Sequence, residues 1–197
     1  QGTGASFGAS STTLQSGTTL FQSSYFSNGW YGDLTAYPLD PSTGAVLAPT
    51  WSAGSLLTAS DWTKRKVLVS NGSSAVPFIY ANISAAQQAV LGGTSQVVDF
   101  LRGDRSNEMP AGLLRTRPGV LGDIISSQPV FVGAPNNSLY PGASFTGAAT
   151  YQAFATAQAA RTPTIYVGAN DGMLHGFNAT TGAEIFAYVP KAAITSD

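Results

Sequence analysis

Residues 164–190 contain the pattern that most constrains the fold, because three short apolar runs are separated by two turns. The runs cover residues 165–169, 173–177 and 183–189. The first turn, Asn170-Asp171-Gly172, consists of residues that tolerate positive φ, which is typical of a hairpin. Pro190 ends the last run because proline has no N–H to donate to a neighbouring strand. We predict an antiparallel meander of three strands, apolar on both faces and suited to burial between other sheets.

Residues 20–51 repeat this pattern nearer the N-terminus. We expect strands at 20–26, 30–39 and 45–51, with turns at 27–29 and 40–44. The segment GDLTAY at 32–37 aligns with GMLHGF at 172–177, and each copy is followed by a Thr-Gly-Ala turn. Repeated meanders of this size are typical of β-propeller blades, which bury their faces against one another. The alternative is a chance similarity between two meanders.

The remaining segments predict less regular structure. Residues 1–17 are rich in Gly, Ser and Thr, so we expect a flexible linker or a loosely held edge, with order beginning near Thr18. Further expected elements are a helical turn at 53–57, strands at 66–70 and 75–80, helices from Ser84 to 91 and from Ser95 to 101, a strand at 127–133, and an insertion at 135–164 with a helix at 148–161.

Taken in order, these elements predict a mainly β fold: an incomplete β-propeller of about three antiparallel blades with short helical insertions. Its domain would span 18–197, with blade-like meanders near 18–52 and 127–190 and an irregular blade with helices across 62–123. A blade takes ~40 to 50 residues and a closed ring needs at least four. We therefore expect a fragment of a larger polypeptide, or association with another chain that completes the stack of sheets.

The composition excludes several classes of function. Only 10% of the residues are charged and the formal net charge is −1, so no basic surface is expected to attract nucleic acid. The absence of cysteine excludes disulfides and thiolate metal sites, and no apolar run is long enough for a membrane span. Eight of the nineteen charged residues lie within 99–123 with mixed signs, which predicts networks of ion pairs.

Three segments in order carry a family resemblance: VDFLRGDRSNE at 98–108, LGDIISSQPVFVGAP at 121–135, and the meander from 166 to 190. Across most of residues 62–190 the chain resembles the C-terminal propeller domain of the PilC/PilY type IV pilus proteins. The resemblance implies a secreted bacterial protein of the outer membrane and pilus tip that acts in pilus biogenesis, surface adhesion and twitching motility, without catalysis. Its implied partners are pilus components such as minor pilins, and host or surface receptors.

Members of this family can carry a calcium loop with the spacing D-x-[DN]-x-[DN]-G, which arranges alternate oxygens around one ion. This chain lacks that spacing, since Asp171-Gly172 has no alternate acids before it. We therefore expect no metal or other cofactor in this segment, with calcium possible elsewhere in a full-length protein.

Arg102-Gly103-Asp104 is a candidate integrin-type adhesion motif, in which an exposed guanidinium and carboxylate would engage an acidic pocket and a metal ion. The alternative is a structural ion-pair role at the end of a helix. His175, the only histidine, offers no base–nucleophile pair and is expected to be packed or hydrogen-bonded. Asp171 and Asp123 are expected to accept hydrogen bonds from backbone N–H groups at turns.

Six aromatic residues could form a platform for sugar or protein, or pack between blades: Tyr25, Phe26, Trp30, Tyr31, Tyr37 and Trp51. A second functional class is also open, because quinone-cofactor dehydrogenases use similar Gly-x-Leu-x-Ala repeats that end in Thr-Gly. Against it, the chain lacks vicinal cysteines and convergent acids. A third class, a purely structural assembly scaffold, is not distinguished from the first. No catalytic residue is assigned.

Overall fold

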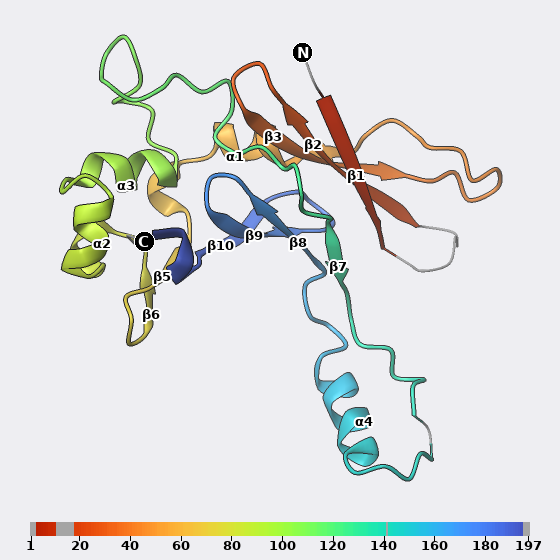
Figure 1. Cartoon of the computed structure of the whole chain (residues 1–197). Coiled ribbons are helices and arrows are strands. Elements are labelled where there is room, and N and C mark those ends of the chain that lie inside the picture. The colour runs from red at the N-terminus through yellow and green to blue at the C-terminus, as the bar shows by residue number, and fades with distance from the viewer. Residues whose placement is uncertain (1–2, 11–17, 141, 195–197) are drawn as a thin grey trace.

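The computed structural model of the chain describes residues 3–10, 18–140 and 142–194, and it contains two β-sheets that pack against each other (Figure 1). The first sheet has the strand order β1-β2-β3-β4 and is antiparallel throughout. Its strands are β1 (Thr3–Ala9), β2 (Thr19–Phe26), β3 (Tyr31–Pro38) and β4 (Trp51–Ser52).

The second sheet has six strands in the order β6-β5-β10-β9-β8-β7. The predicted meander forms its centre, as β8 (Thr164–Ala169), β9 (Met173–Asn178) and β10 (Glu184–Val189). Gly172 in the first turn has φ of 84°, a conformation that glycine adopts without strain. This prediction from the alternation of apolar runs and turns is confirmed.

The outer strands of the second sheet are β5 (Val67–Ser70), β6 (Ala75–Pro77) and β7 (Val130–Val132). β5 pairs with β10 in parallel, whereas every other pair in the sheet is antiparallel. The strands expected at 66–70 and 75–80 therefore extend the second sheet and do not form a separate blade. Local sequence patterns do not specify such pairing between distant segments.

Three helices lie beside the sheets, α1 (Ala53–Ala59), α2 (Ala85–Val90) and α3 (Ser95–Arg102), and α4 (Ala148–Ala157) lies away from them. Short 3₁₀ turns are η1 (Trp62–Lys64), η2 (Tyr80–Asn82) and η3 (Lys191–Ile194). At the start of α2, Ser84 and Gln87 form the reciprocal hydrogen bonds of a capping box. The cap of α3 is Thr94, not Ser95 as expected, and it makes no side-chain capping bond.

Two predictions near the N-terminus were wrong, the onset of order near Thr18 and the strand at 45–51, whereas the alternative of an edge segment within residues 1–17 agrees with β1. Order does not begin at Thr18, because Thr3–Ala9 is the edge strand β1, paired with β2 over its whole length. Most side chains of β1 are small, so its sequence shows little of the apolar pattern that predicts a strand. The expected strand at 45–51 is reduced to β4 and an isolated bridge between Leu39 and Val46, since Pro49 has no N–H to donate. The expected linker residues 11–17 lie outside the described residues.

Two clusters of buried apolar side chains form the core. The first lies between the sheets and includes Phe21, Leu34, Leu121, Ile165 and Phe177. The second joins the second sheet to α2 and α3 and includes Val69, Phe78, Val98, Met173 and Val189. The described residues thus form a mainly β protein whose sheets do not close into a ring, as predicted for an incomplete propeller. They form two sheets and not about three antiparallel blades, because β5 and β6 join the second sheet through the parallel pair of β5 with β10.

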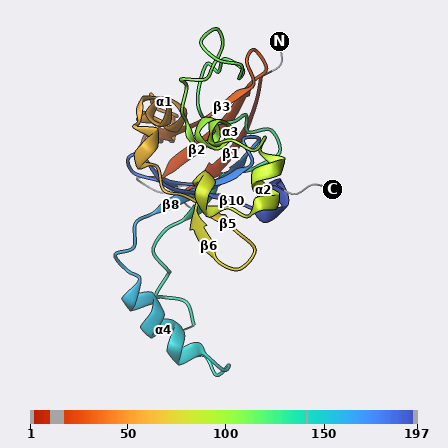
Figure 2. The same cartoon turned by 90° about the vertical axis from the view of Figure 1, so that its left-hand side faces the viewer.

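One segment, which we call the arm (residues 134–160), projects away from the sheets between β7 and β8, as both Figure 1 and Figure 2 show. It contains α4, as the Ala-rich sequence predicted. At its base Arg161 donates from Nε to the carbonyl oxygen of Gly133 at 2.5 Å. A search of the described helices for one long and apolar enough to cross a bilayer finds none.

Candidate functional site

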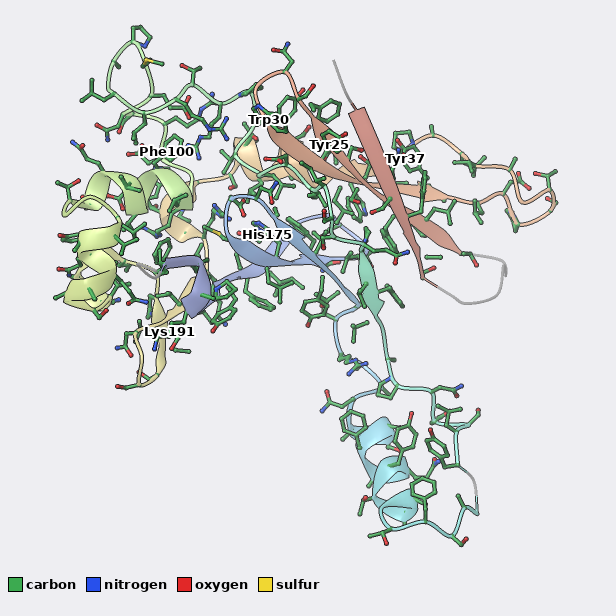
Figure 3. All side chains as sticks on the ribbon, in the orientation of Figure 1. Tyr25, Trp30, Tyr37, Phe100, His175 and Lys191 are labelled. Atoms are coloured by element: carbon green, nitrogen blue, oxygen red, sulfur yellow. The ribbon has the colours of Figure 1, made fainter. Side chains whose placement is uncertain are left out.

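A buried chain of alternating charges crosses the second sheet beside the core. The Arg65 guanidinium donates to both carboxylate oxygens of Glu184, at 2.7 and 2.8 Å. Glu184 Oε1 also lies 2.9 Å from His175 Nδ1, and His175 Nε2 lies 3.1 Å from an oxygen of Asp171. The side chain of His175 is fully buried, and those of Arg65 and Glu184 are 4% and 6% exposed. Figure 3 shows His175 within the second sheet. We call these four residues the charge chain.

The carboxylates on both ring nitrogens favour a protonated imidazole. Burial alone would lower the pKa of His175, but the charge of Asp171 and the hydrogen bonds to both acids raise it to about 9. Burial would likewise raise the pKa of Glu184, but the hydrogen bonds from Arg65 and His175 lower it to about 2. His175 therefore donates through both nitrogens, and two cations alternate with two anions.

Residues 121–123 connect the charge chain to the first sheet. Gly122 donates its N–H to Asp171 Oδ2 at 3.1 Å, and Asn170 donates both its backbone N–H and its side-chain amide to Asp123. On the other side Gly32 in β3 donates to the carbonyl oxygen of Leu121. A Cβ on Gly122 would lie 2.4 Å from the backbone nitrogen of Asp171, so only glycine fits this contact.

The predicted motif at 102–104 lies at the C-terminal end of α3. Arg102 and Gly103 are buried, and the Arg102 guanidinium lies over the ring of Trp62, 5.1 Å from its centre. Gly103 has φ of 121° and ends the helix. Asp104 is half-buried and accepts hydrogen bonds from the N–H and hydroxyl of Ser106.

Two further arginines bind the carbonyl oxygens at this helix end, where a cation is favoured by the helix dipole. Arg65 donates to the oxygen of Arg102 at 2.6 Å. Arg117 donates to the oxygens of Phe100 and Asp104, both at 2.8 Å, and its guanidinium stacks on the Phe100 ring. Arg117 is also paired with buried Glu108 at 2.9 Å. The predicted ion-pair networks of 99–123 are thus present, and they join α3 to the second sheet through Arg65.

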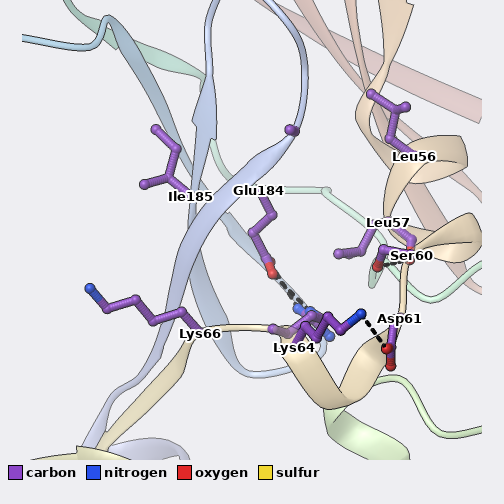
Figure 4. Close-up of a pocket in the computed structure, with 10 residues that line it drawn as sticks. Leu56, Leu57, Ser60, Asp61, Lys64, Lys66, Glu184 and Ile185 are labelled. Carbon is purple, nitrogen blue, oxygen red and sulfur yellow. Dashed lines mark hydrogen bonds and ion pairs between the residues drawn. The ribbon is translucent and has the colours of Figure 1, made fainter.

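A surface hollow of about 400 Å³ adjoins the charge chain between α1, η1 and β10 (Figure 4). Leu56, Leu57 and Ile185 line it beside Arg65 and Glu184. The two charged groups at its floor are already bonded to each other, and Lys64 at its rim is paired with Asp61. Among the described residues, no three His, Asp or Glu side chains are grouped as metal ligands would be.

The six aromatic residues predicted as a platform or as core do not gather in one place. Trp51 packs against the first core cluster and stacks on Phe21. Phe26 and Tyr31 stack on each other, with ring centres 4.7 Å apart. Trp30 is 52% exposed at the turn between β2 and β3, where Figure 3 labels it, with Tyr25 and Tyr37 further along the sheet.

Comparison with known proteins follows the same segments. Residues 121–197 match the family model of the PilY1 beta-propeller domain. Over 98% of its length the chain is 46% identical to the "Type IV pilus biogenesis factor PilY1 homolog" of Xylella fastidiosa, and over 87% it is 41% identical to the "Type IV pilus biogenesis factor PilY1" of Pseudomonas aeruginosa strain PAK. The predicted resemblance is confirmed.

The chain spans only 15% and 16% of the length of these two PilY1 relatives. No solved structure matches it. Two of the three segments that carried the resemblance, 121–135 and 166–190, lie inside the PilY1 propeller match, and they meet at the contact of Gly122 with Asp171. The third, 98–108, lies before that range and is joined to it through Arg65 and Glu184.

Sequence reasoning placed Asp171 and Asp123 as acceptors from backbone N–H groups and His175 as packed or hydrogen-bonded. The Asp171 carboxylate accepts from the N–H groups of Gly122 and Met173, and His175 is hydrogen-bonded, whereas the Asp123 carboxylate accepts from the side-chain amide of Asn170.

Sequence reasoning missed Arg65 and Glu184. The available signal was the spacing of His175 and Glu184 on two adjacent strands, where a lone histidine and a lone acid interrupt apolar runs and share a face.

Proposed function

We propose that this chain is a non-enzymatic propeller segment of a type IV pilus biogenesis factor. The observation that carries the proposal is the 46% identity to a type IV pilus biogenesis factor over 98% of the chain. The charge chain supports it: its four groups neutralise one another inside the fold, which is the arrangement of a structural network and not of a poised acid or base.

The full-length protein would act at the outer membrane and pilus tip, in pilus biogenesis, surface adhesion and twitching motility. Its partners would be minor pilins and surface receptors. The two sheets end in the strands β1 and β4 and in β6 and β7, which supports an assembly role, since a terminal strand can pair with a further strand.

The test is to delete the coding sequence of residues 1–197 from the gene of the full-length factor and count surface pili and twitching. We expect both to fall while the secreted protein is still detected, and to recover when the corresponding segment of the Xylella relative is inserted. Unchanged pili after the deletion would contradict the proposal. Stoichiometric binding of a quinone to the purified chain, followed by absorbance, would instead favour the dehydrogenase alternative.

For Arg102-Gly103-Asp104 we propose the structural role and not integrin adhesion. The burial of Arg102 and Gly103 supports this, because an integrin needs the guanidinium and the carboxylate at an exposed tip. Asp104→Glu is expected to leave any binding of the chain to an immobilised integrin unchanged, as is Asp61→Glu, the matched control. Loss of binding in the Asp104 variant alone would assign adhesion to the motif.

A further inference from the structure

The outward face of the first sheet carries aromatic rings at both ends and polar side chains between them. The alternate residues of these strands, such as Phe21 and Leu34, are buried in the first core cluster. Residues paired directly across strands share a face, and the pairs of β2 with β3 on the side away from the second sheet are Phe26–Tyr31, Ser24–Asp33, Gln22–Thr35 and Leu20–Tyr37. On β1, Phe7 lies opposite Gln22. At about 3.4 Å per residue, these pairs extend over about 20 Å.

Two hollows lie on this face and adjoin at Phe26, which lines both. The larger, of about 530 Å³, lies between the Phe26–Tyr31 pair and α1. The smaller, of about 350 Å³, is lined by Gln22 and Ser24. The rings of Phe26 and Tyr31 stack with an angle of 18° between their planes. Hollows of this size, lined by aromatic rings with a few polar groups, are typical of sites for small ligands.

The polar side chains of this face have hydrogen-bonding capacity to spare. Gln22, Ser24, Tyr31 and Tyr37 are half-buried, and their side chains make no hydrogen bond with any other described residue. Amide and hydroxyl groups both donate and accept. A ligand on this face would therefore meet unused donors and acceptors beside the rings.

The face offers no unpaired charge. Asp33 is the one charged residue among the pairs described above. Its carboxylate already accepts from the N–H groups of Leu34 and Gly54 and from the hydroxyls of Thr35 and Ser52. A carboxylate has about four acceptor sites, so Asp33 has none left for a ligand. A charged ligand would lose hydration here without gaining an ion pair, which favours a neutral one.

The turn at one end of the face is held in place by Arg115. Trp30 in this turn is 52% exposed and has φ of 47°, which is rare for a bulky residue. The Arg115 guanidinium donates to the carbonyl oxygens of Gly29 and Trp30, at 2.7 and 3.1 Å. Backbone strain of this kind persists where the surrounding contacts impose it, and it is common at ligand sites. The turn therefore presents a further exposed ring next to Tyr31.

We propose that the outward face of the first sheet binds a neutral oligosaccharide. The faces of a sugar ring carry C–H groups that pack on aromatic rings, and its edge carries hydroxyls that exchange hydrogen bonds with amides and hydroxyls. The face supplies both kinds of contact over a length that several sugar units would fill. The inference rests on the proposed function, in that it gives the chemical class of a surface receptor.

The test measures binding of the full-length factor to immobilised cellopentaose, maltopentaose, mannopentaose and chitopentaose. We expect binding to at least one of these probes, with a Kd that rises about tenfold in Tyr31→Ala because the ring contact is lost. Tyr31→Phe, which keeps the ring, and Gln22→Ala should each raise the Kd by a smaller factor. Tyr188→Ala, at a half-buried tyrosine of the second sheet, is the matched control and should leave the Kd unchanged.

Several outcomes would overturn the proposal. They are no binding to any probe, an equal Kd for the wild type, Tyr31→Ala and Gln22→Ala, and tighter binding of sialyllactose than of lactose, which would mean that the site selects an anion. Binding by the 197-residue chain but not by the full-length factor would mean that the longer protein covers this face, and would also overturn it. The assay does not depend on piliation, so the sugar site and the proposed function can fail separately.

Discussion

The body of the molecule, by which we mean the two sheets with α1, α2 and α3, and the arm are stabilised by different kinds of contact. The body buries two networks of charged groups around α3 and β10, each arginine paired with a carboxylate or a helix carbonyl. The arm contains no charged residue from 134 to 160 and exposes aromatic side chains, with Tyr140, Phe145 and Phe154 each about half exposed. The body therefore depends on paired buried charges, whereas the arm is held by contacts among its own aromatic rings, such as those of Tyr140 with Phe145 and Tyr151. Four predictions test this difference, from the largest effect to the smallest.

Glu184→Ala is expected to cause the largest loss of stability. It leaves Arg65 and His175 buried without their shared carboxylate, and removal of one partner from a buried pair costs about 3–5 kcal/mol. Urea unfolding followed by fluorescence measures the change. Lys64→Ala, which breaks the exposed pair with Asp61, serves as the control and should have little effect. If the two variants unfold at the same urea concentration, the buried charge chain stabilises the body no more than an exposed ion pair does.

The stability of the body should also depend on pH through His175. Its pKa is raised from 6.5 to about 9 on folding, so its contribution is complete below about pH 6.5 and is lost as the pH rises toward 9. The free energy of unfolding should fall by up to about 3 kcal/mol over that interval. The lowered pKa of Glu184 predicts a second loss as the pH falls from about 4.5 to about 2. In the His175→Gln variant the free energy of unfolding should no longer fall between pH 6.5 and 9. A fall that persists in this variant would mean that another group causes it.

A methyl group at Gly122 should disturb the contact that joins the two sheets. The added Cβ would lie 2.4 Å from the nitrogen of Asp171, and overpacking of this kind costs about 1–3 kcal/mol. Gly119→Ala is the matched control, because its Cβ would meet no atom closer than 3.4 Å. Thermal unfolding of both variants should show a lower Tm for Gly122→Ala only, and equal values would mean that residues 121–123 are free to shift.

Replacement of residues 136–158 by a short Gly-Ser linker should have the smallest effect. The arm meets the body at its base, and a change of loop length costs about 1 kcal/mol or less. The Tm should stay within a few degrees of wild type, with the near-ultraviolet circular dichroism of the body retained. Unfolding of the whole chain on removal of the arm would show that the arm supports the body after all.

The sequence predicted those parts of the molecule that local patterns determine. The meander of β8 to β10, the capping box of Ser84 and the helix of the arm each depend on residues within a few positions of one another. The parallel pairing of β5 with β10 was missed because it joins segments far apart in the chain. The charge chain was missed for the same reason: Arg65 lies 119 residues before Glu184, and no spacing rule connects them.

That parallel pairing also constrains the order in which the protein can be made. Val67 pairs with Ala187, about 120 residues later, so the strand β5 has no partner on that side until β10 has been made. Until then one edge of the β5–β6 hairpin has no partner strand. Closing the long loop between β5 and β10 is slow. Completion of the second sheet therefore follows the folding of the β5–β6 hairpin and depends on the arrival of β10.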